Sequence, residues 1–237
     1  MSDTKPFEGR TAVVTGASRG IGAATALALA EAGAHVILVA RKVKALEEVE
    51  DRIHEVGGTS TIAPIDLTEP DAVTRLAAAI AGRWDSLDMM VISAAYLPEL
   101  TPLSQIDPKQ FNTAIMTNVV ATQALIAGFD QLLRNAEAGR IIGLTSSVGA
   151  SPRSFWGAYG STKAAFENLL DTYAAEVEKL SPLRVAIIDP GATRTEMRAR
   201  AYPGEKPETV KLPEVVAARI TALLQEDFPT GHRERVE

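Results

Sequence analysis

The sequence predicts an α/β fold, in which one domain, residues 1–237, is built on an open, doubly wound parallel sheet with helices on both faces. Three observations support this prediction. Short apolar segments rich in Val and Ile recur along the chain, helical patterns fill the gaps between them, and 46% of the 237 residues are hydrophobic. Near-continuous apolar segments are typical of parallel strands covered on both faces. Strand–helix alternation then predicts right-handed crossovers and a ligand site beyond the carboxyl ends of the strands.

The strands are predicted at six places. They are TAVVT (11–15), HVILVA (35–40), TSTIAPI (59–65), LDMMVIS (87–93), RIIGLTS (140–146) and LRVAIID (183–189). Two segments fall outside the alternation. About residues 1–9 are interpreted as an N-terminal tail. About residues 196–213, which carry three prolines and alternating charges, are interpreted either as a solvated connection or as a lid over the substrate.

Composition and charge exclude several classes of function. The formal net charge is −6 without a basic run, so we expect no nucleic-acid partner. There is no cysteine, and the three histidines lie far apart in the chain, so we expect no metal site. No unbroken apolar run approaches the roughly 18 residues of a spanning helix, so we expect no membrane association and a cytoplasmic protein.

A glycine-rich turn follows the first predicted strand. TGASRGIG (15–22) lies between that strand and an alanine-rich segment with high helix propensity. Gly16, Gly20 and Gly22 would allow a tight turn, a close approach of backbone to a pyrophosphate, and close packing of helix on strand. The helix N-terminus would offer free N–H groups to anionic oxygens. The position of this turn therefore predicts a Rossmann-type dinucleotide site.

The end of the second strand predicts which dinucleotide binds. A carboxylate there would accept hydrogen bonds from the adenosine ribose and repel a 2′-phosphate. The sequence instead has Ala40, Arg41 and Lys42, and Arg19 lies in the glycine-rich turn. Arginines form charge-assisted hydrogen bonds to phosphate, so NADP(H) is favoured over NAD(H).

A tyrosine and a lysine four residues apart predict the reacting centre. Tyr159 and Lys163 would lie on one face of the helix after the fifth strand. A neighbouring ammonium favours the phenolate, so Lys163 would help Tyr159 to exchange a proton with a carbonyl or alcohol oxygen. Ser146 or Ser147, at the end of the fifth strand, would polarise that oxygen. Neighbours at a strand end point in opposite directions, so only one of the two should face the site.

These motifs together resemble the short-chain dehydrogenase/reductase family, over nearly the whole chain. The family pattern TGxxxGIG corresponds to residues 15–22, YxxxK to Tyr159 and Lys163, and PGxxxT to residues 190–195. The resemblance selects Ser146 as the serine and implies a helix asparagine in a proton relay. The implied catalytic residues are Asn118, Ser146, Tyr159 and Lys163. The implied cofactor-binding residues are Gly16, Ser18, Arg19, Gly20, Ile21, Gly22, Arg41, Asp66, Leu67, Ala94, Tyr159, Lys163, Pro190, Gly191, Thr193 and Thr195.

The sequence departs from the family pattern in two places. ISAA (92–95) stands where the family usually has NNAG and keeps only the alanine, Ala94; it lacks the asparagines that usually pin the central sheet, while its small residues should preserve the cofactor groove. The chain ends in TGHRERVE, where family members usually continue through a glycine-rich strand of a second subunit interface. The resemblance implies a homodimer at least, through the helices that carry Asn118 and Tyr159, and leaves a homotetramer open.

The sequence therefore predicts an NADP(H)-dependent oxidoreductase that transfers hydride between nicotinamide and a carbonyl or secondary alcohol. Trp156 and Met197, with the nearby Phe155, Tyr96, Leu97 and Tyr202, indicate an apolar or aromatic small-molecule substrate or simply packing. The alternative is a dinucleotide-binding regulator with little or no turnover, for which ISAA is the best support. Epimerases and dehydratases rank last.

Overall fold

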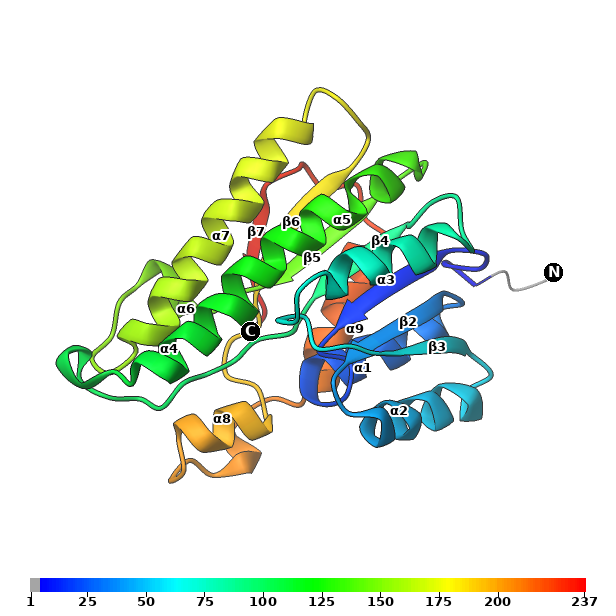
Figure 1. The fold of residues 1–237 in the computed structure, drawn as a ribbon. Helices are drawn as coiled ribbons and strands as arrows, with labels where there is room; N and C mark the ends of the chain where they lie inside the picture. Colours follow the sequence, from blue (N-terminus) through cyan, green and yellow to red (C-terminus); the bar gives the residue numbers. More distant parts are fainter. Residues whose placement is uncertain (1–4) are drawn as a thin grey trace.

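The computed structural model describes residues 5–237, and these form a seven-stranded, entirely parallel sheet with helices on both faces (Figure 1). The strand order is β3-β2-β1-β4-β5-β6-β7, so the chain reverses its direction of growth between β1 and β4. The strands are β1 (Thr11–Thr15), β2 (His35–Ala40), β3 (Thr59–Pro64), β4 (Met89–Ile92), β5 (Arg140–Leu144), β6 (Arg184–Asp189) and β7 (His232–Arg235). The predicted fold class is confirmed, and the six predicted strands are present within about two residues at each end.

Helices connect the strands and cover the two faces of the sheet. The α-helices are α1 (Gly20–Glu31), α2 (Val43–Glu55), α3 (Ala72–Ala81), α4 (Pro108–Ile115), α5 (Ala121–Asn135), α6 (Ser147–Ala150), α7 (Gly157–Val177), α8 (Glu196–Ala201) and α9 (Pro213–Leu223). A π-helical turn, Met116–Val120, joins α4 to α5, and short 3₁₀ turns occur at Leu103–Gln105 and Pro207–Thr209. One face carries α1, α2 and α9, and the other carries α3, α5 and α7.

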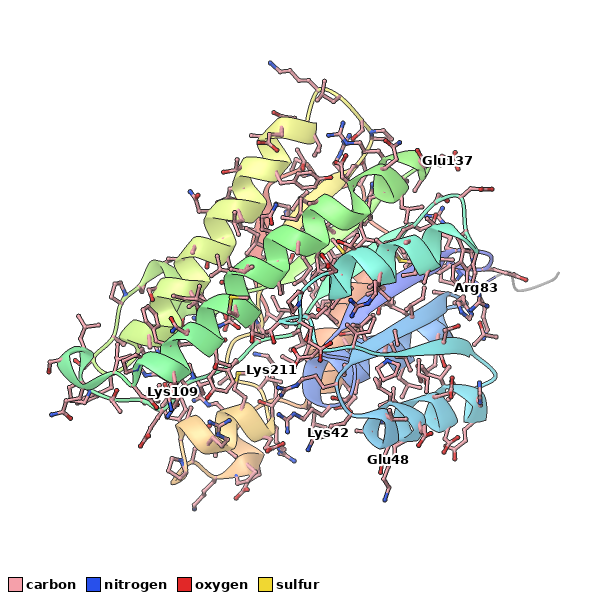
Figure 2. The ribbon with its side chains drawn as sticks, viewed as in Figure 1. Lys42, Glu48, Arg83, Lys109, Glu137 and Lys211 are labelled. Carbon is pink, nitrogen blue, oxygen red and sulfur yellow. The ribbon has the colours of Figure 1, made fainter. Side chains whose placement is uncertain are left out.

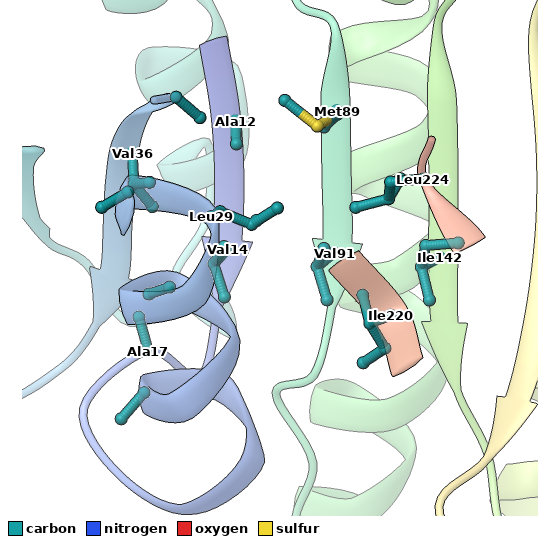
Figure 3. Close-up of a cluster of buried hydrophobic side chains, with 14 of the residues drawn as sticks. Ala12, Val14, Ala17, Leu29, Val36, Met89, Val91, Ile142, Ile220 and Leu224 are labelled. Atoms are coloured by element: carbon teal, nitrogen blue, oxygen red, sulfur yellow. The ribbon is translucent and has the colours of Figure 1, made fainter. Parts of the chain in front are cut away.

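Two hydrophobic cores lie on opposite faces of the sheet because successive strand residues point in opposite directions. In β1, Ala12 and Val14 face the core under α1 and α9, whereas Val13 faces the core under α5 and α7. Figure 3 shows the first core, where Leu29 of α1 and Ile220 of α9 pack beside Val91 of β4. All five residues of β1 are buried, as expected for a central strand covered on both faces.

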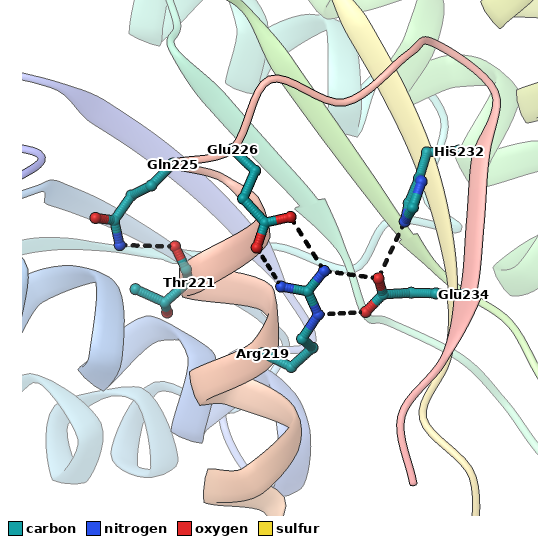
Figure 4. A network of polar contacts seen from close by, with 6 residues as sticks. All are labelled: Arg219, Thr221, Gln225, Glu226, His232 and Glu234. Carbon is teal, nitrogen blue, oxygen red and sulfur yellow. Dashed lines mark hydrogen bonds and ion pairs between the residues drawn. The ribbon is translucent and has the colours of Figure 1, made fainter.

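The seventh strand is absent from the sequence prediction, which was wrong here. Residues 232–235 read HRER, without the apolar run that identifies a buried strand, and they alternate between half-buried and exposed. Ion pairs hold this charged edge strand to α9 instead. Arg219 donates to Glu234 at 2.6 Å and to Glu226 at 2.6 Å, and His232 lies 3.0 Å from Glu234 (Figure 4).

The two irregular segments are more ordered than the sequence suggests. Residues 1–4 of the expected tail lie outside the described residues, but Phe7 is buried and its N–H donates to Ala32 O at 2.9 Å, so this part packs against the domain. Residues 196–213 begin with α8, contain a 3₁₀ turn and pair through a bridge between Thr193 and Lys211, so they are not an irregular loop. In Figure 2, Lys42 marks the carboxyl edge of the sheet, whereas Arg83 and Glu137 mark the opposite edge.

Candidate functional site

The glycine-rich turn meets two distant segments at the carboxyl edge of the sheet. Gly16 has a φ of +68°, and a Cβ there would lie 2.9 Å from Ala94 Cα. A Cβ at Gly22 would lie 2.3 Å from Gly16 O, and one at Gly20 would lie 3.3 Å from Thr195 Cγ2. At Gly16 and Gly22 the backbones approach so closely only because these residues lack a side chain, whereas Gly20 faces the side chain of Thr195. The turn therefore brings Ala94, after β4, and Thr195, before α8, to the N-terminus of α1.

The N-terminal turn of α1 carries no competing acid. The N-cap residue, Arg19, makes no side-chain hydrogen bond to the helix, and the first turn contains no Asp or Glu. Ser18 is half-buried, and Ile21 packs against the adjacent core. The N–H groups at this end of the helix favour an anion through their partial positive charge.

A threonine hydroxyl holds the end of β4 where the family usually has asparagines. Thr15 Oγ1 accepts hydrogen bonds from the N–H groups of Ser93 at 3.1 Å and Ala94 at 3.2 Å, and it lies 3.4 Å from Val91 O. Thr15 is fully buried, and loss of its hydroxyl would leave the partly buried N–H groups of Ser93 and Ala94 without this acceptor. Polar pinning of the central sheet is thus present in this chain, and it comes from β1.

The predicted adenosine-binding residues lie together after β2 and β3. Arg41 Nη1 is 3.8 Å from Asp66 Oδ2, and both side chains reach solvent. Burial would raise the pKa of Asp66, but hydrogen bonds from Thr68 and the charge of Arg41 outweigh it and lower that pKa. The following residue, Leu67, packs against the core under α3. A second exposed arginine, Arg19, pairs with Glu196 at the start of α8.

Tyr159 and Lys163 lie side by side and buried in α7. Lys163 Nζ is 5.8 Å from the centroid of the Tyr159 ring and donates to Leu144 O at 2.7 Å. Burial raises the pKa of the Tyr159 phenol, and the charge of Asp189 raises it further. Burial lowers the pKa of Lys163 to about 8, against a smaller opposing effect from the charge of Glu167. At neutral pH the pair is therefore a phenol beside an ammonium.

The two adjacent serines differ in their surroundings. Ser147 accepts a hydrogen bond from Arg153 Nη2 at 3.0 Å, which turns its hydroxyl toward the loop before α7. Ser146 is half-buried at the end of β5, with an extended backbone, and its side chain does not cap α6. The geometry favours Ser146 as the serine whose hydroxyl is free to meet a ligand.

Asn118 lies in the π-helical turn and joins three parts of the site. Its Oδ1 accepts from Tyr96 N at 2.8 Å, and its Nδ2 donates to Tyr96 O at 3.0 Å and to Thr162 Oγ1 at 2.9 Å. The side chain is buried, so these bonds fix the loop after β4 against α7. The sequence analysis missed Thr162, which is buried one residue before Lys163; only its place inside the YxxxK pattern signals it.

The segment after β6 turns sharply before α8. Gly191 has a φ of +62°, and its N–H donates to Asp189 Oδ1 at 2.9 Å. The buried Thr193 donates to Pro190 O at 3.1 Å, and Thr195 caps α8 by accepting from Arg198 N at 3.1 Å. These bonds shape the segment from within, and its Thr195 lies close to Gly20 of the glycine-rich turn.

Apolar side chains surround Tyr159, and a cavity with both polar and apolar walls lies beside them. Leu97, Val148 and Tyr159 form a small cluster with Leu100, Trp156, Met197 and Ala201. The Trp156 ring centroid is 6.0 Å from that of Tyr159 and 5.8 Å from that of Tyr202. A cavity of about 620 Å³ shares Leu97, Leu100 and Ala201 with the cluster, and Arg200 and Glu99 lie at its wall. The structure thus places Trp156 and Met197 in one cluster with Tyr159.

Phe155 is the strained residue of this region. Its φ of +72° is rare for a bulky side chain, and 57% of the residue is exposed. Sequence reasoning gave no sign of this conformation. Residues in such conformations cluster at ligand sites.

Two kinds of feature are absent from residues 5–237. None of the helices in that range is both long and apolar enough to cross a membrane. In the same range no three His, Cys, Asp or Glu side chains come together in a group suited to a metal ion.

Known proteins are similar to this chain in sequence and in fold. The profile of the short chain dehydrogenase family matches residues 10–206. The uncharacterized oxidoreductase YciK of Escherichia coli K12 is 36% identical over 207 residues, which cover 86% of this chain and 81% of that protein. A short chain dehydrogenase structure from Salmonella enterica serovar Typhi superposes with a TM-score of 0.94 at 33% identity, over 100% of this chain and 99% of the other.

A further similar structure, from Escherichia coli CFT073, is a complex with NADPH. It superposes with a TM-score of 0.92 at 34% identity, over 99% of each chain. The family match covers most of the chain, and the similarity in structure extends over the whole sheet. The chain belongs to the short-chain dehydrogenase/reductase family of oxidoreductases.

Proposed function

We propose that this protein reduces a carbonyl compound, or oxidises the corresponding secondary alcohol, with NADP(H) as cofactor. The observation that carries the proposal is the buried Tyr159–Lys163 pair, which lies at the carboxyl edge of the sheet beside a cavity with both polar and apolar walls. A buried phenol next to an ammonium suits proton exchange with a substrate oxygen.

The residues at this edge fit a dinucleotide. The close approach at Gly16 and the uncapped N-terminus of α1 suit a pyrophosphate, and Arg19 and Arg41 suit a 2′-phosphate. Asp66 and Leu67 would hold the adenine, and the Pro190–Thr195 segment would cover the nicotinamide. NADPH in the similar Escherichia coli CFT073 structure supports this choice.

The chain's own residues would handle the proton. A bound nicotinamide cofactor supplies the hydride that reaches the carbonyl carbon. Tyr159 would give its phenolic proton to the carbonyl oxygen as the C=O π bond breaks, and Ser146 would donate a hydrogen bond to the same oxygen. The raised pKa of Tyr159 keeps the phenol protonated at neutral pH, which suits the reducing direction. Lys163, as ammonium, would stabilise the phenolate left behind.

Residues 196–213 would serve as the lid of the cavity. Met197 and Ala201 of α8 pack against the Tyr159 cluster, and Tyr202 lies against Trp156. The apolar cluster around Tyr159 favours an apolar or aromatic carbonyl compound. We propose a homodimer through the helices that carry Asn118 and Tyr159, since Met116 and Val120 beside Asn118 are exposed. A cytoplasmic location stays a prediction.

Titration of the purified protein with NADPH and NADH, followed by a panel of ketones and aldehydes monitored by cofactor absorbance, tests the proposal. We expect preferential NADPH binding and turnover of at least one apolar ketone. Tight NADPH binding without turnover across the panel would favour the regulator instead. Failure to bind either cofactor would contradict both functions.

A further inference from the structure

A buried carboxylate lies one helical turn beyond Lys163, outside the groups that the proposed reaction uses. Glu167 is on α7, and only 8% of the residue is exposed. Burial of a carboxylate is costly unless hydrogen bonds or opposite charges compensate. Residues i and i+4 share a face of a helix, so Glu167 faces the same side as Lys163.

Glu167 joins the strand end that carries Ser146 to the last strand of the sheet. Its Oε1 accepts from Thr145 Oγ1 at 2.5 Å, and its Oε2 accepts from Arg233 Nη1 of β7 at 2.7 Å. Thr145 directly precedes Ser146, and its N–H donates to Ile188 O at 2.8 Å. A Cβ at Gly149 would lie 2.8 Å from Glu167 Oε1, so the carboxylate also fits closely against α6.

The charges around Lys163 are few and identifiable. Glu167 opposes the lowering of the Lys163 pKa by burial, and the Phe166 ring centroid lies 4.4 Å from Nζ. Asp189 acts on Tyr159 from β6. Arg233 is shared between Glu167 and Asp171, which it reaches at 2.5 Å, so Arg233 does not neutralise Glu167 alone. Glu167 is thus the acid on α7 that acts on Lys163.

We propose that Glu167 is a positioning residue of this site, which keeps Lys163 charged and fixes the Thr145–Ser146 strand end. The inference rests on the proposed function, because it assigns Glu167 to the carbonyl chemistry of Tyr159 and Lys163. Glu167 touches neither substrate nor cofactor in this assignment. It acts through Lys163 on one side and through Thr145 on the other.

The first experiment measures the Lys163 titration without substrate, in protein labelled with ¹³C at lysine Cε. The Lys163 signal is assigned by its loss in Lys163→Arg. We expect a midpoint near 8 in the unaltered protein and a midpoint lower by about one pH unit in Glu167→Gln, because a nearby opposite charge is removed. Glu167→Asp, which keeps the charge, should stay close to the unaltered protein. An identical midpoint in Glu167→Gln and the unaltered protein would overturn the proposal.

The second experiment measures the pH profile of ketone turnover. In Glu167→Gln the alkaline limb of kcat should move to lower pH by the same amount, since turnover requires the ammonium. Thr145→Val should lower kcat severalfold without moving the Lys163 midpoint. Glu176→Gln, an exposed acid on the same helix, is the matched control for both readouts.

The outcomes separate this inference from the proposed function. A protein that binds NADPH but turns over no carbonyl compound would reject the reductase, whereas the Lys163 midpoint would still be measured. If Glu167→Gln fails to fold, Thr145→Val decides, since it removes the hydrogen bond to Glu167 and keeps the buried charge. An unchanged kcat in Thr145→Val would overturn the positioning role.

Discussion

The two halves of the carboxyl edge hold their charges in opposite ways. Around β1 to β3, the side chains of Arg19 and Arg41 are 65% and 69% exposed, and each meets a partly exposed carboxylate. Around β5 and α7, Lys163 and Glu167 are only 2% and 8% exposed and are held by short hydrogen bonds. The edge therefore combines a solvated, cationic half with a buried, mixed-charge half.

This difference indicates what each half does well. Exposed charges are screened by salt and change partners at little cost, which suits the selection of an anionic ligand. Buried charges shift one another's pKa values, which suits proton chemistry. Mutations should therefore impair cofactor binding at one half and turnover at the other separately.

Removing the Tyr159 hydroxyl should produce the largest effect. Tyr159→Phe keeps the ring and its contact with Trp156 but removes the proton donor, so kcat should fall by about 10²- to 10⁴-fold. The dissociation constant for NADPH should change little, as measured by cofactor fluorescence. Tyr173→Phe is the matched control, because it removes a buried hydroxyl of the same helix that bonds to Asp130 at 2.6 Å. Turnover retained in Tyr159→Phe would refute the proposed acid.

Arg41→Ala should impair only the exposed half around β1 to β3, through cofactor binding. Loss of a charge-assisted contact should weaken NADPH binding by about 10- to 100-fold and leave NADH binding nearly unchanged. The loss should shrink as the salt concentration rises, since Arg41 is exposed. Lys44→Ala removes an exposed cation from the neighbouring helix and serves as the control. Equal losses for the two cofactors would contradict a 2′-phosphate role.

Thr15→Val tests the contact between β1 and the end of β4, where the two halves meet. The substitution leaves the partly buried N–H groups of Ser93 and Ala94 without their acceptor, so the free energy of unfolding should fall by about 1–3 kcal/mol. Thr25→Val is a stringent control, because Thr25 Oγ1 is buried and has no hydrogen-bond partner within residues 5–237. Chemical denaturation of both variants checks the prediction. Equal stability losses would show that the Thr15 bonds contribute nothing specific.

Glu196→Gln should have the smallest effect. Its carboxylate competes with a phosphate for Arg19, so its removal should tighten NADPH binding by less than about fivefold at low salt. The gain should vanish at high salt, and Glu208→Gln, on the same exposed segment, should show none. Weaker binding in Glu196→Gln would show that the ion pair orders the site instead.

The sequence was most informative where structure is local. The six apolar strands, the glycine-rich turn and the Tyr159–Lys163 spacing follow from patterns within about 20 residues. β7 was missed because an edge strand need not be apolar, and its charges pair with α9, which no periodicity reveals. The helical part of residues 196–213 was missed because its prolines and glycine signal a loop.

The contacts that tune the site were beyond the sequence for a different reason. Arg233 reaches Glu167 across 66 positions of the chain, and Thr15 reaches Ala94 across 79. Such pairs depend on strand order, which places β1 next to β4 and β6 next to β7. The resemblance identified Asn118, but only the structure shows that its side chain holds Tyr96 and Thr162.

The place of Arg233 in the chain has a consequence for synthesis. A ribosome makes the protein from its N-terminus, and domains fold as their segments emerge. Glu167 is made more than 60 residues before Arg233, which is its partner on β7. During that interval the carboxylate must stay in contact with water, since burial without a cation is costly. The reacting centre therefore reaches its final arrangement only after residue 233 has left the ribosome, so a nascent chain arrested before β7 should lack it.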